Sequence, residues 1–564
     1  MLRRLSSLSL VALPAVFTAG AAGVTLAPWA AAVAAACVGG VAAGIAARGV
    51  RRDPALLVLG GVLGWAGVLT ALQPVDVAPA AWTLAGGVTA WVVAAAAQRP
   101  RSQAGARWGV ALAGVAAAVY LTAERLVEGS RPGGPLEQPV LSATLVMLGL
   151  AVLPMLRLPR AAAAAAAAVL LAGIVASGSR AAMLAVVAVA GVWALTLGGA
   201  KARWAAAVVA GIALGALAVR IVTDPDPLRW ERVRIWQVAV RTALAEAPWG
   251  AGPGGFADAA LPHNFPRDGE LARWYREPSL AESDVLQLAA VLGFPGLALG
   301  VALAFLLLRR ATPGGLGVLA GLAVTSAVNT QLPVPAVAVA AALAVAGTRR
   351  RPRPVTLWRC TGPQALAAGV LVAVVTGLAL SWPRPGLLPG AESLAAEARQ
   401  LAASHWGAAV VRAGEAVRRR PRWGEGRRLL ASLYLAQGVH RREAALVERA
   451  AQEYGAARTA NPRDAFAVYG EAECARLLGE PRRARQLAAE AVRLEPHFAR
   501  AWLLLAALEL AQGQLAGACQ ALQDAERARR AGDGVVMISA YEEELVRWDG
   551  VRAALVGSAC GGSQ

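Results

Sequence analysis

Lysine, histidine and cysteine are scarce in this chain of 564 residues, which has one lysine, Lys201, four histidines and five cysteines. The cysteines are not spaced like the ligands of a metal ion, so we expect no metal site. Cys474 and Cys519 are either free thiols or a disulfide, and their small-residue positions favour free thiols. Since arginine replaces lysine almost everywhere, we attribute the frequency of arginine and alanine to coding bias.

Charged residues are also few, at 16%, whereas 57% of the residues are hydrophobic and the mean hydropathy is +0.51. This composition is too apolar for a soluble protein of this length. Apolar runs long enough to cross a bilayer as helices recur through the first two thirds of the chain. They lie at 8–26, 28–47, 55–73, 80–97, 108–123, 140–156, 161–177, 181–198, 204–221, 285–308, 314–332, 334–348 and 362–382. The first run has no convincing cleavage site, so we interpret it as a retained anchor.

The net charge of +19 is distributed as in a membrane protein. With the N-terminus inside, the loops predicted to be cytoplasmic contain nineteen basic residues and one acid, Asp53. The external loops contain eleven arginines and fourteen acids. This is the positive-inside pattern, which makes a nucleic-acid partner unnecessary. It predicts a multi-pass membrane protein, surrounded by membrane lipids, with the loop 221–284 and the part after Trp382 outside the cytoplasm.

Amphipathic helices replace the apolar runs after Trp382, and their pattern recurs after thirty-four residues. Trp502 aligns with Val468, and Pro496 and Pro462 close successive repeats. Alanines align at the positions where two helices of a hairpin pack closely: Ala506 with Ala472, Ala518 with Ala484, and Ala525 with Ala491. The pattern resembles about three tetratricopeptide repeats, and a generic array of helical hairpins is the alternative. Either array offers a concave surface for protein partners.

We therefore predict an all-α chain that combines a polytopic membrane domain with a helical solenoid. The membrane domain spans 1–382 and includes the large external loop 221–284. A linker at 383–391 leads to the repeats at 392–530, which are followed by a helical cap and a flexible tail at 531–564.

Polar loops as long as 221–284 are more often functional than connective. Just before this loop, the sequence SGSRAAML (177–184) joins the external end of one predicted span to the next. Ser179 and Arg180 either cap the helix and reach outward, or form an anion site with the helix N-terminus.

WERVRIW (230–236) within the loop places Arg232 and Trp236 on one helical face and Arg234 on another. This segment is either an interfacial helix or a second source of guanidinium groups for the same anion. The next segment, PWGAGPGGF (248–256), contains Gly250, Gly252 and Gly254 but lacks the lysine of a nucleotide-binding loop. It predicts a tight turn with close backbone approach.

Three further residues of the loop are candidates for a general base. Glu282 and Asp284 lie where the chain re-enters the membrane and are either solvated acids at a helix start or a partly buried general base. His263 is the only histidine of the membrane half. A single histidine in a loop is more often incidental than catalytic, although its pKa range suits base chemistry.

The order of these segments is more specific than any one of them. SGSR at a span end, R-x-x-x-W, the glycine turn and a re-entry with S-D-x-L-Q together resemble the O-antigen ligase and polysaccharide polymerase family, including members with tetratricopeptide repeats. The resemblance implies a type C glycosyltransferase that passes a glycan from undecaprenyl diphosphate to a hydroxyl of a lipid or glycan acceptor, without a metal or cofactor. Arg180 and Arg232 or Arg234 would then bind the diphosphate, with Ser179 beside them.

One departure from the family pattern affects the base. Glu282 stands where the family usually has a histidine, and Val291 replaces a carboxylate further on. Either Glu282 or His263 would then act as the base, or the chain is a diverged member with another acceptor or weak activity. Two rival functions remain: a membrane-anchored scaffold for polysaccharide assembly, testable by truncation after Trp382, and a transporter. The small number of ionisable residues in the spans argues against the transporter.

Overall fold

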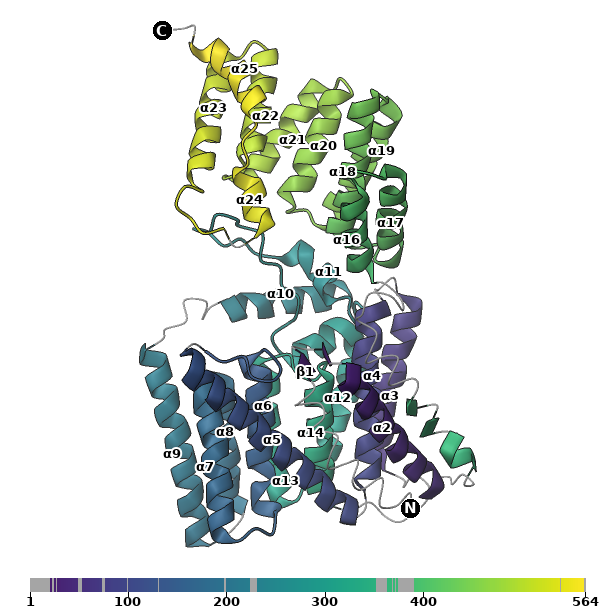
Figure 1. The fold of residues 1–564 in the computed structure, drawn as a ribbon, viewed down its shortest axis with the longest axis vertical. Helices are drawn as coiled ribbons and strands as arrows, with labels where there is room; N and C mark the ends of the chain where they lie inside the picture. Colours follow the sequence, from purple (N-terminus) through teal and green to yellow (C-terminus); the bar gives the residue numbers. More distant parts are fainter. Residues whose placement is uncertain are drawn as a thin grey trace. The chain divides into compact units, whose positions relative to one another are not determined.

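The computed structural model describes residues 21–22, 25–26, 28–48, 53–73, 77–98, 100–129, 131–196, 199–223, 231–350, 363–367, 369–370, 372–373, 390–537 and 539–561. These residues divide into two compact units. The membrane unit contains the described residues up to Gly254 and those between Leu280 and 373. The repeat unit contains Gly255–Ser279 and the described residues from 390 onward. Both units are helical, which confirms the predicted all-α class (Figure 1).

The membrane unit is a bundle of helices. They are α2 (Pro28–Arg48), α3 (Pro54–Leu72), α4 (Val77–Ala96), α5 (Pro100–Glu128), α6 (Pro139–Val152), α7 (Arg160–Ser177), α8 (Arg180–Thr196), α9 (Ala200–Thr223), α10 (Glu231–Ala245), α12 (Asp284–Arg309), α13 (Pro313–Val328) and α14 (Pro335–Thr348). Among the described helices, α3, α5, α7, α9 and α12 are long and apolar enough to cross a membrane. In α9 only 11% of the apolar window is buried, so most of its apolar side chains are left for lipid.

Eleven of the thirteen predicted spans coincide with these helices. The prediction for 8–26 is wrong at its end, because Ala21–Ala22 (β1) pairs antiparallel with Thr25–Leu26 (β2) where a helix was expected. This short ladder reverses the chain just before Pro28 begins α2, and a residue before proline disfavours helix. The rest of that span, and most of 362–382, lie outside the described residues.

A buried carboxylate joins three helix ends in the membrane unit. Asp53 caps α3, because its Oδ1 accepts a hydrogen bond from Ala55 N at 3.0 Å. The same side chain forms ion pairs with Arg310, just after α12, at 3.1 Å and with Arg349, just after α14, at 2.7 Å. Gln98 Nε2 also donates to Asp53 Oδ2 at 3.3 Å. Asp53, the one acidic residue in the loops predicted to be cytoplasmic, therefore links these helix ends.

The repeat unit is a stack of helical hairpins (Figure 1). Its helices pair in order: α16 (Ala391–Leu401) with α17 (Trp406–Arg419), α18 (Gly424–Arg441) with α19 (Ala444–Ala460), α20 (Ala465–Leu477) with α21 (Pro481–Leu494), and α22 (Ala499–Ala511) with α23 (Leu515–Arg530). Four hairpins are present where about three were expected. Two shorter helices, α24 (Ala540–Val546) and α25 (Gly550–Gly561), pack on the last hairpin.

The thirty-four-residue period is present in the helix boundaries. α22 begins thirty-four residues after α20, and α23 begins thirty-four residues after α21. The aligned alanines, Ala472, Ala506, Ala484 and Ala518, are all fully buried. Small side chains at these positions allow the paired helices to approach closely, so the alignment predicted the packing correctly.

The second half of the polar loop folds with the repeats and not with the membrane helices. Gly255–Ser279, which contains α11 (Phe256–Ala260) and the 3₁₀ turn η2 (Leu261–His263), belongs to the repeat unit. The buried Glu495 accepts hydrogen bonds from the backbone N–H groups of Arg273 at 2.9 Å and Trp274 at 3.0 Å. The Trp274 indole N–H donates to Leu494 O at 3.1 Å. The loop backbone is thus held by α21 and the residue after it.

Charged side chains fix the two ends of this loop segment. Asp258 accepts two hydrogen bonds from Arg420, at 2.7 and 2.9 Å, in a pair of mostly buried side chains. Near the other end, Asn461 Nδ2 donates to Glu277 Oε1 at 3.2 Å. Bidentate pairs of this kind position groups as well as stabilise them.

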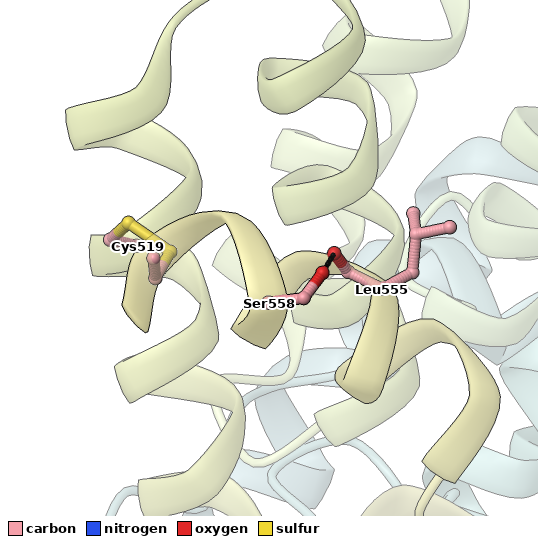
Figure 2. Close-up of a disulfide and its surroundings, with 4 residues drawn as sticks. Cys519, Leu555 and Ser558 are labelled. Atoms are coloured by element: carbon pink, nitrogen blue, oxygen red, sulfur yellow. Dashed lines mark hydrogen bonds between the residues drawn. A yellow bond between two sulfur atoms is a disulfide. The ribbon is translucent and has the colours of Figure 1, made fainter. Parts of the chain in front are cut away.

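The expectation that Cys519 is a free thiol is wrong, because Cys519 of α23 is bonded to Cys560 of α25 (Figure 2). The pairing joins residues forty-one apart in the sequence, with Cα atoms 5.7 Å apart. Cys560 belongs to a segment that was predicted as a tail and instead forms a helix. Cys474 is a buried free thiol, as expected.

Candidate functional site

The candidate site is built around the turn between α7 and α8. Gly178 ends α7 with a left-handed φ of +59°, which glycine adopts without strain. The buried Ser179 accepts a hydrogen bond from Ala182 N at 3.3 Å, and Ser177 Oγ accepts one from Ser179 N at 3.1 Å. Ser179 therefore caps α8, which is the first of the two interpretations offered for it from the sequence. Arg180 is the first residue of α8 and is half-buried.

Two arginines that the sequence analysis did not single out lie against this turn. A Cβ placed on Gly178 would be 3.5 Å from Arg220 Nε and 3.7 Å from Arg131 Nε. Arg131, from the loop between α5 and α6, donates from Nε to Ser177 O at 3.3 Å. Arg220 lies in the last turn of α9. Two guanidinium groups thus flank the turn that leads into Arg180. In the sequence, the only property that pointed to these two arginines was their predicted position outside the cytoplasm.

The helix α10 brings Arg232 into the membrane unit. It lies across one end of the upright helices in Figure 1, and Arg232 Nη1 donates to Val328 O, at the end of α13, at 3.1 Å. Trp236, one turn later, donates its indole N–H to Glu282 O at 3.0 Å. The predicted helix and its shared face are therefore confirmed. Arg234 is exposed, and its two-residue offset directs it to another face.

The packing of α13 on α8 relates Arg232 to Arg180. A Cβ placed on Gly317 would touch Trp193, and one placed on Gly321, one turn later, would touch Val189, one turn earlier. The helices therefore run antiparallel, and the end of α13 lies beside the start of α8. The arginines of α8 and α10 consequently share one end of the bundle, as one interpretation of the sequence required.

Glu282 has an unusual backbone and electrostatic environment. Its φ is +50°, a left-handed conformation that is strained for a residue other than glycine and is often found at functional sites. Burial raises the pKa of its carboxyl above the ordinary value, and the positive charge of Arg232 partly opposes that rise. A half-buried carboxyl next to a guanidinium is an arrangement suited to a general base.

Asp284 has a different set of contacts. Its Oδ1 accepts hydrogen bonds from the backbone N–H groups of Gln331 at 2.9 Å and Leu332 at 3.0 Å, and the side chain is buried. The preceding Ser283 caps α12 by accepting from Leu286 N at 3.5 Å. The carboxylate therefore holds the turn between α13 and α14.

The glycine turn is a close approach of two backbones. Gly250, Gly252 and Gly254 have φ values of +84°, +80° and +81°. A Cβ placed on Gly250 would be 2.4 Å from Gly293 N and 2.5 Å from Val291 O. This agrees with the interpretation of the segment as a tight turn rather than a phosphate-binding loop.

The partner of this turn is a break in α12. Gly293 has φ +64° and ψ −164°, so the helical hydrogen bonds are interrupted there. Ala251 N donates to Ala290 O at 2.8 Å and Gly252 N to Val291 O at 2.9 Å, which satisfies carbonyls that the break leaves free. Irregular backbone is tolerated in membrane helices where protein satisfies it in this way.

His263 belongs to a different unit from the other candidate residues. It lies in η2 within the loop segment that packs on the repeats, whereas Glu282 belongs to the membrane unit. The geometry within the membrane unit brings together Arg180, Arg131 and Arg220 at one turn, and Arg232 with Glu282 at a second position on the same end.

The segment that contains all of these residues except Arg131 is similar to a known family. Residues 165–301 match the model of the O-Antigen ligase family, a match that runs from α7 into α12. No curated protein matches the chain.

Solved structures of repeat proteins are similar to part of the chain. One is a Pseudomonas aeruginosa pilF structure, with 16% identity, a TM-score of 0.24, and coverage of 34% of this chain and 79% of that chain. Another is a thermophilic TPR protein of Thermus thermophilus, with 24% identity, a TM-score of 0.24, and coverage of 35% and 94%. Residues 165–301 are thus similar to the O-Antigen ligase family, and they lie in a helical membrane protein that also carries TPR-like hairpins.

Proposed function

We propose that this protein transfers a glycan from undecaprenyl diphosphate to an acceptor hydroxyl on the extracytoplasmic face of the bacterial plasma membrane. The O-antigen ligase domain supports a membrane ligase of the glycosyltransferase type. The observation that carries the finer proposal is the gathering of arginines at one end of the membrane unit, within and beside the matched segment.

Arg180 is the proposed centre of the diphosphate site. Arg131 and Arg220 lie at the turn before it, and Arg232 adds a fourth guanidinium at the same end. Guanidinium groups bind phosphate oxygens through two N–H donors each and remain charged at any physiological pH. They would stabilise the negative charge that develops as the diphosphate leaves.

Glu282 is the proposed base. The acceptor O–H gives its proton to the Glu282 carboxylate while the oxygen forms a bond to the anomeric carbon. The bond from that carbon to the diphosphate oxygen breaks, and its electron pair stays on the carrier, which departs as undecaprenyl diphosphate. The reaction therefore needs no reactant other than the acceptor and the carrier-linked glycan.

Two independent observations support the extracytoplasmic side. The basic residues of the loops predict that side for Arg180, the loop 221–284 and the repeats. The disulfide between Cys519 and Cys560 lies in the repeats, and disulfides persist in oxidising compartments.

Deleting the gene and analysing the lipid-linked glycans tests the function. A ligase should leave complete glycan chains on the carrier, and a polymerase should leave single repeat units. Complementation with the intact gene should remove either product. A carrier pool that does not change on deletion would contradict both versions of the proposal.

Glu282→Gln should reduce transfer by about 10²–10⁴-fold, the usual contribution of a general base. Because the base must be deprotonated, transfer by the unaltered protein should fall as the pH drops through the raised pKa of Glu282. The variant should lose this acid limb. The measurement is the pH profile of transfer in proteoliposomes.

Glu137→Gln is the matched control, since Glu137 also has a left-handed backbone, with φ +52°, but is exposed. It should keep both rate and pH profile. An unaltered acid limb in Glu282→Gln would assign the base to another group.

A further inference from the structure

A large groove lies within the repeat unit, and one of its walls comes from the ligase domain. The groove has a volume of about 1190 Å³, above the roughly 300–1,000 Å³ typical of sites for one small molecule. Its lining residues come from the hairpins, from α24 and α25, and from the loop segment 255–279. All of them belong to the repeat unit. The loop wall contributes Trp274, Tyr275 and Glu277.

Side chains of the repeats that could bind the backbone of a peptide already bind the backbone of the loop segment 255–279. Glu495 accepts both backbone N–H groups of Arg273 and Trp274, and Arg463 donates to the backbone carbonyl of Asn264. Glu495 is fully buried by this arrangement and does not line the groove. The chain's own loop is therefore the extended segment that the repeats hold, and a different kind of ligand must fill the remaining space.

The charges of the lining are paired with one another. Six of the seven lining arginines form ion pairs with lining carboxylates, as Arg428 does with Asp464 at 3.3 Å and Arg552 with Glu473 at 2.7 Å. The lining has seven arginines and six carboxyl groups, so its net charge is small, and it offers both hydrogen-bond donors and acceptors. Such a surface selects an uncharged ligand that can both donate and accept hydrogen bonds.

Aromatic rings supply the other part of the surface. Seven of the lining residues are aromatic, and the chain has only thirty aromatic residues in all. The Tyr275 ring, 41% exposed, lies 5.2 Å from the Tyr541 ring, and Trp274 lies beneath the Arg463 guanidinium at 4.6 Å. Three of the seven, Trp423, Tyr454 and Tyr469, are buried, so the accessible ring surface comes mainly from Tyr275 and its half-buried neighbours. Exposed ring faces are apolar surfaces on which the C–H faces of sugar rings stack.

Glu277, in the loop wall of the groove, can both donate and accept a hydrogen bond. Its carboxylate can be reached by solvent but is surrounded by protein, and Asn461 donates to it at 3.2 Å. The low polarity of these surroundings, together with the charge of Asp464, raises its pKa to about 7. Near neutral pH this carboxyl can therefore either donate to or accept from a hydroxyl group.

We infer that the groove is a glycan site, which holds several sugar units of the acceptor or of the growing chain. The inference rests on the proposed function for the choice of substrate. It requires an oligosaccharide of low net charge, lying between the aromatic loop wall and the paired charges of the hairpins.

Filling the groove tests the site, and the substituted hydroxyl residue gives up only a hydrogen bond within its own helix. Ser432 lies on the groove side of α18 with its side chain exposed, so Ser432→Trp should occlude the groove. Thr459→Trp is the matched control: Thr459 is an exposed hydroxyl residue on α19 outside the lining. The full chain in nanodiscs is titrated with size-fractionated oligosaccharides released from the source cell's surface polysaccharide, and binding is followed by saturation-transfer NMR.

Ser432→Trp and Glu277→Gln should weaken oligosaccharide binding by about tenfold or more. Thr459→Trp, and Glu270→Gln on the same loop but outside the groove, should bind as the unaltered protein does. Arg180→Ala should also bind normally while it loses transfer, which separates the two proposals. Oligosaccharide binding unchanged by Ser432→Trp, or a groove that binds only extended peptides, would overturn the glycan site and leave the proposed transfer reaction standing.

Discussion

Arg180→Ala is expected to lower glycan transfer by about 10²–10³-fold, the effect of removing one electrostatic stabiliser of a leaving group. The residue begins α8 at the turn where the Arg131 and Arg220 side chains lie. Without its charge, the diphosphate would lose one of the groups that stabilise it as it leaves. The measurement is transfer to acceptor in proteoliposomes at saturating carrier-linked donor.

Two further variants make the result specific. Arg180→Lys keeps the positive charge but not the paired donors, so it should restore only part of the rate. Arg241→Ala removes an exposed arginine from α10 in the same loop and should leave transfer unchanged. Folded Arg180→Ala protein with normal transfer would remove this residue from the proposed site.

Gly250→Ala is expected to prevent the membrane unit from folding. The new Cβ would be within 2.6 Å of three backbone atoms of Val291 and Gly293, which have no flexible side chain to move aside. Left-handed φ adds about 1–2 kcal/mol for alanine. Together, the steric overlap and the backbone strain should lower the free energy of unfolding by more than the roughly 4–5 kcal/mol that only exceptional substitutions reach. The yield of monodisperse protein in detergent and its thermal unfolding midpoint measure this.

Substitutions at two other glycines distinguish the effect of steric overlap from the effect of the left-handed backbone. Gly269→Ala has the same left-handed requirement, with φ +95°, but meets no atom within 4 Å, so it should show the backbone cost alone. Gly211→Ala, in the open interior of α9, should be neutral or slightly stabilising because alanine favours helix. If Gly250→Ala behaves like Gly269→Ala, the two backbones do not approach as closely as described.

The helices were predictable because two strong periodic signals define them. Apolar runs of bilayer length gave eleven of the described membrane helices, and the thirty-four-residue period gave the hairpins. The pairing of Ala21–Ala22 with Thr25–Leu26 was not predictable, since two-residue strands carry no periodicity. Cys560 was missed as a partner of Cys519 because its segment, rich in glycine and serine, resembled a tail.

The candidate site was predictable only where its residues cluster in sequence. The helical spacing of Arg232 and Trp236 indicated their shared face, and the glycine turn indicated a close approach. Arg131 reaches the turn before Arg180 from the loop between α5 and α6, and Arg220 reaches it from α9. No local sequence pattern predicts such a long-range contact. The engagement of Asp284 with the turn between α13 and α14 is likewise a property of the packed bundle.

The loop segment that packs on the repeats has a consequence for how this protein can be dissected. Gly255–Ser279 lies inside the matched segment 165–301, yet its hydrogen-bonding partners are Glu495, Arg420 and Asn461. Within the described residues, the chain therefore enters the repeat unit at Gly255, returns to the membrane unit at Leu280 and is again part of the repeat unit from 390 onward. Truncation after Trp382 would deprive the segment 165–301 of the surface on which part of it folds. Loss of activity on truncation would thus be expected of an enzyme as well as of a scaffold, and only point substitutions can tell the two apart.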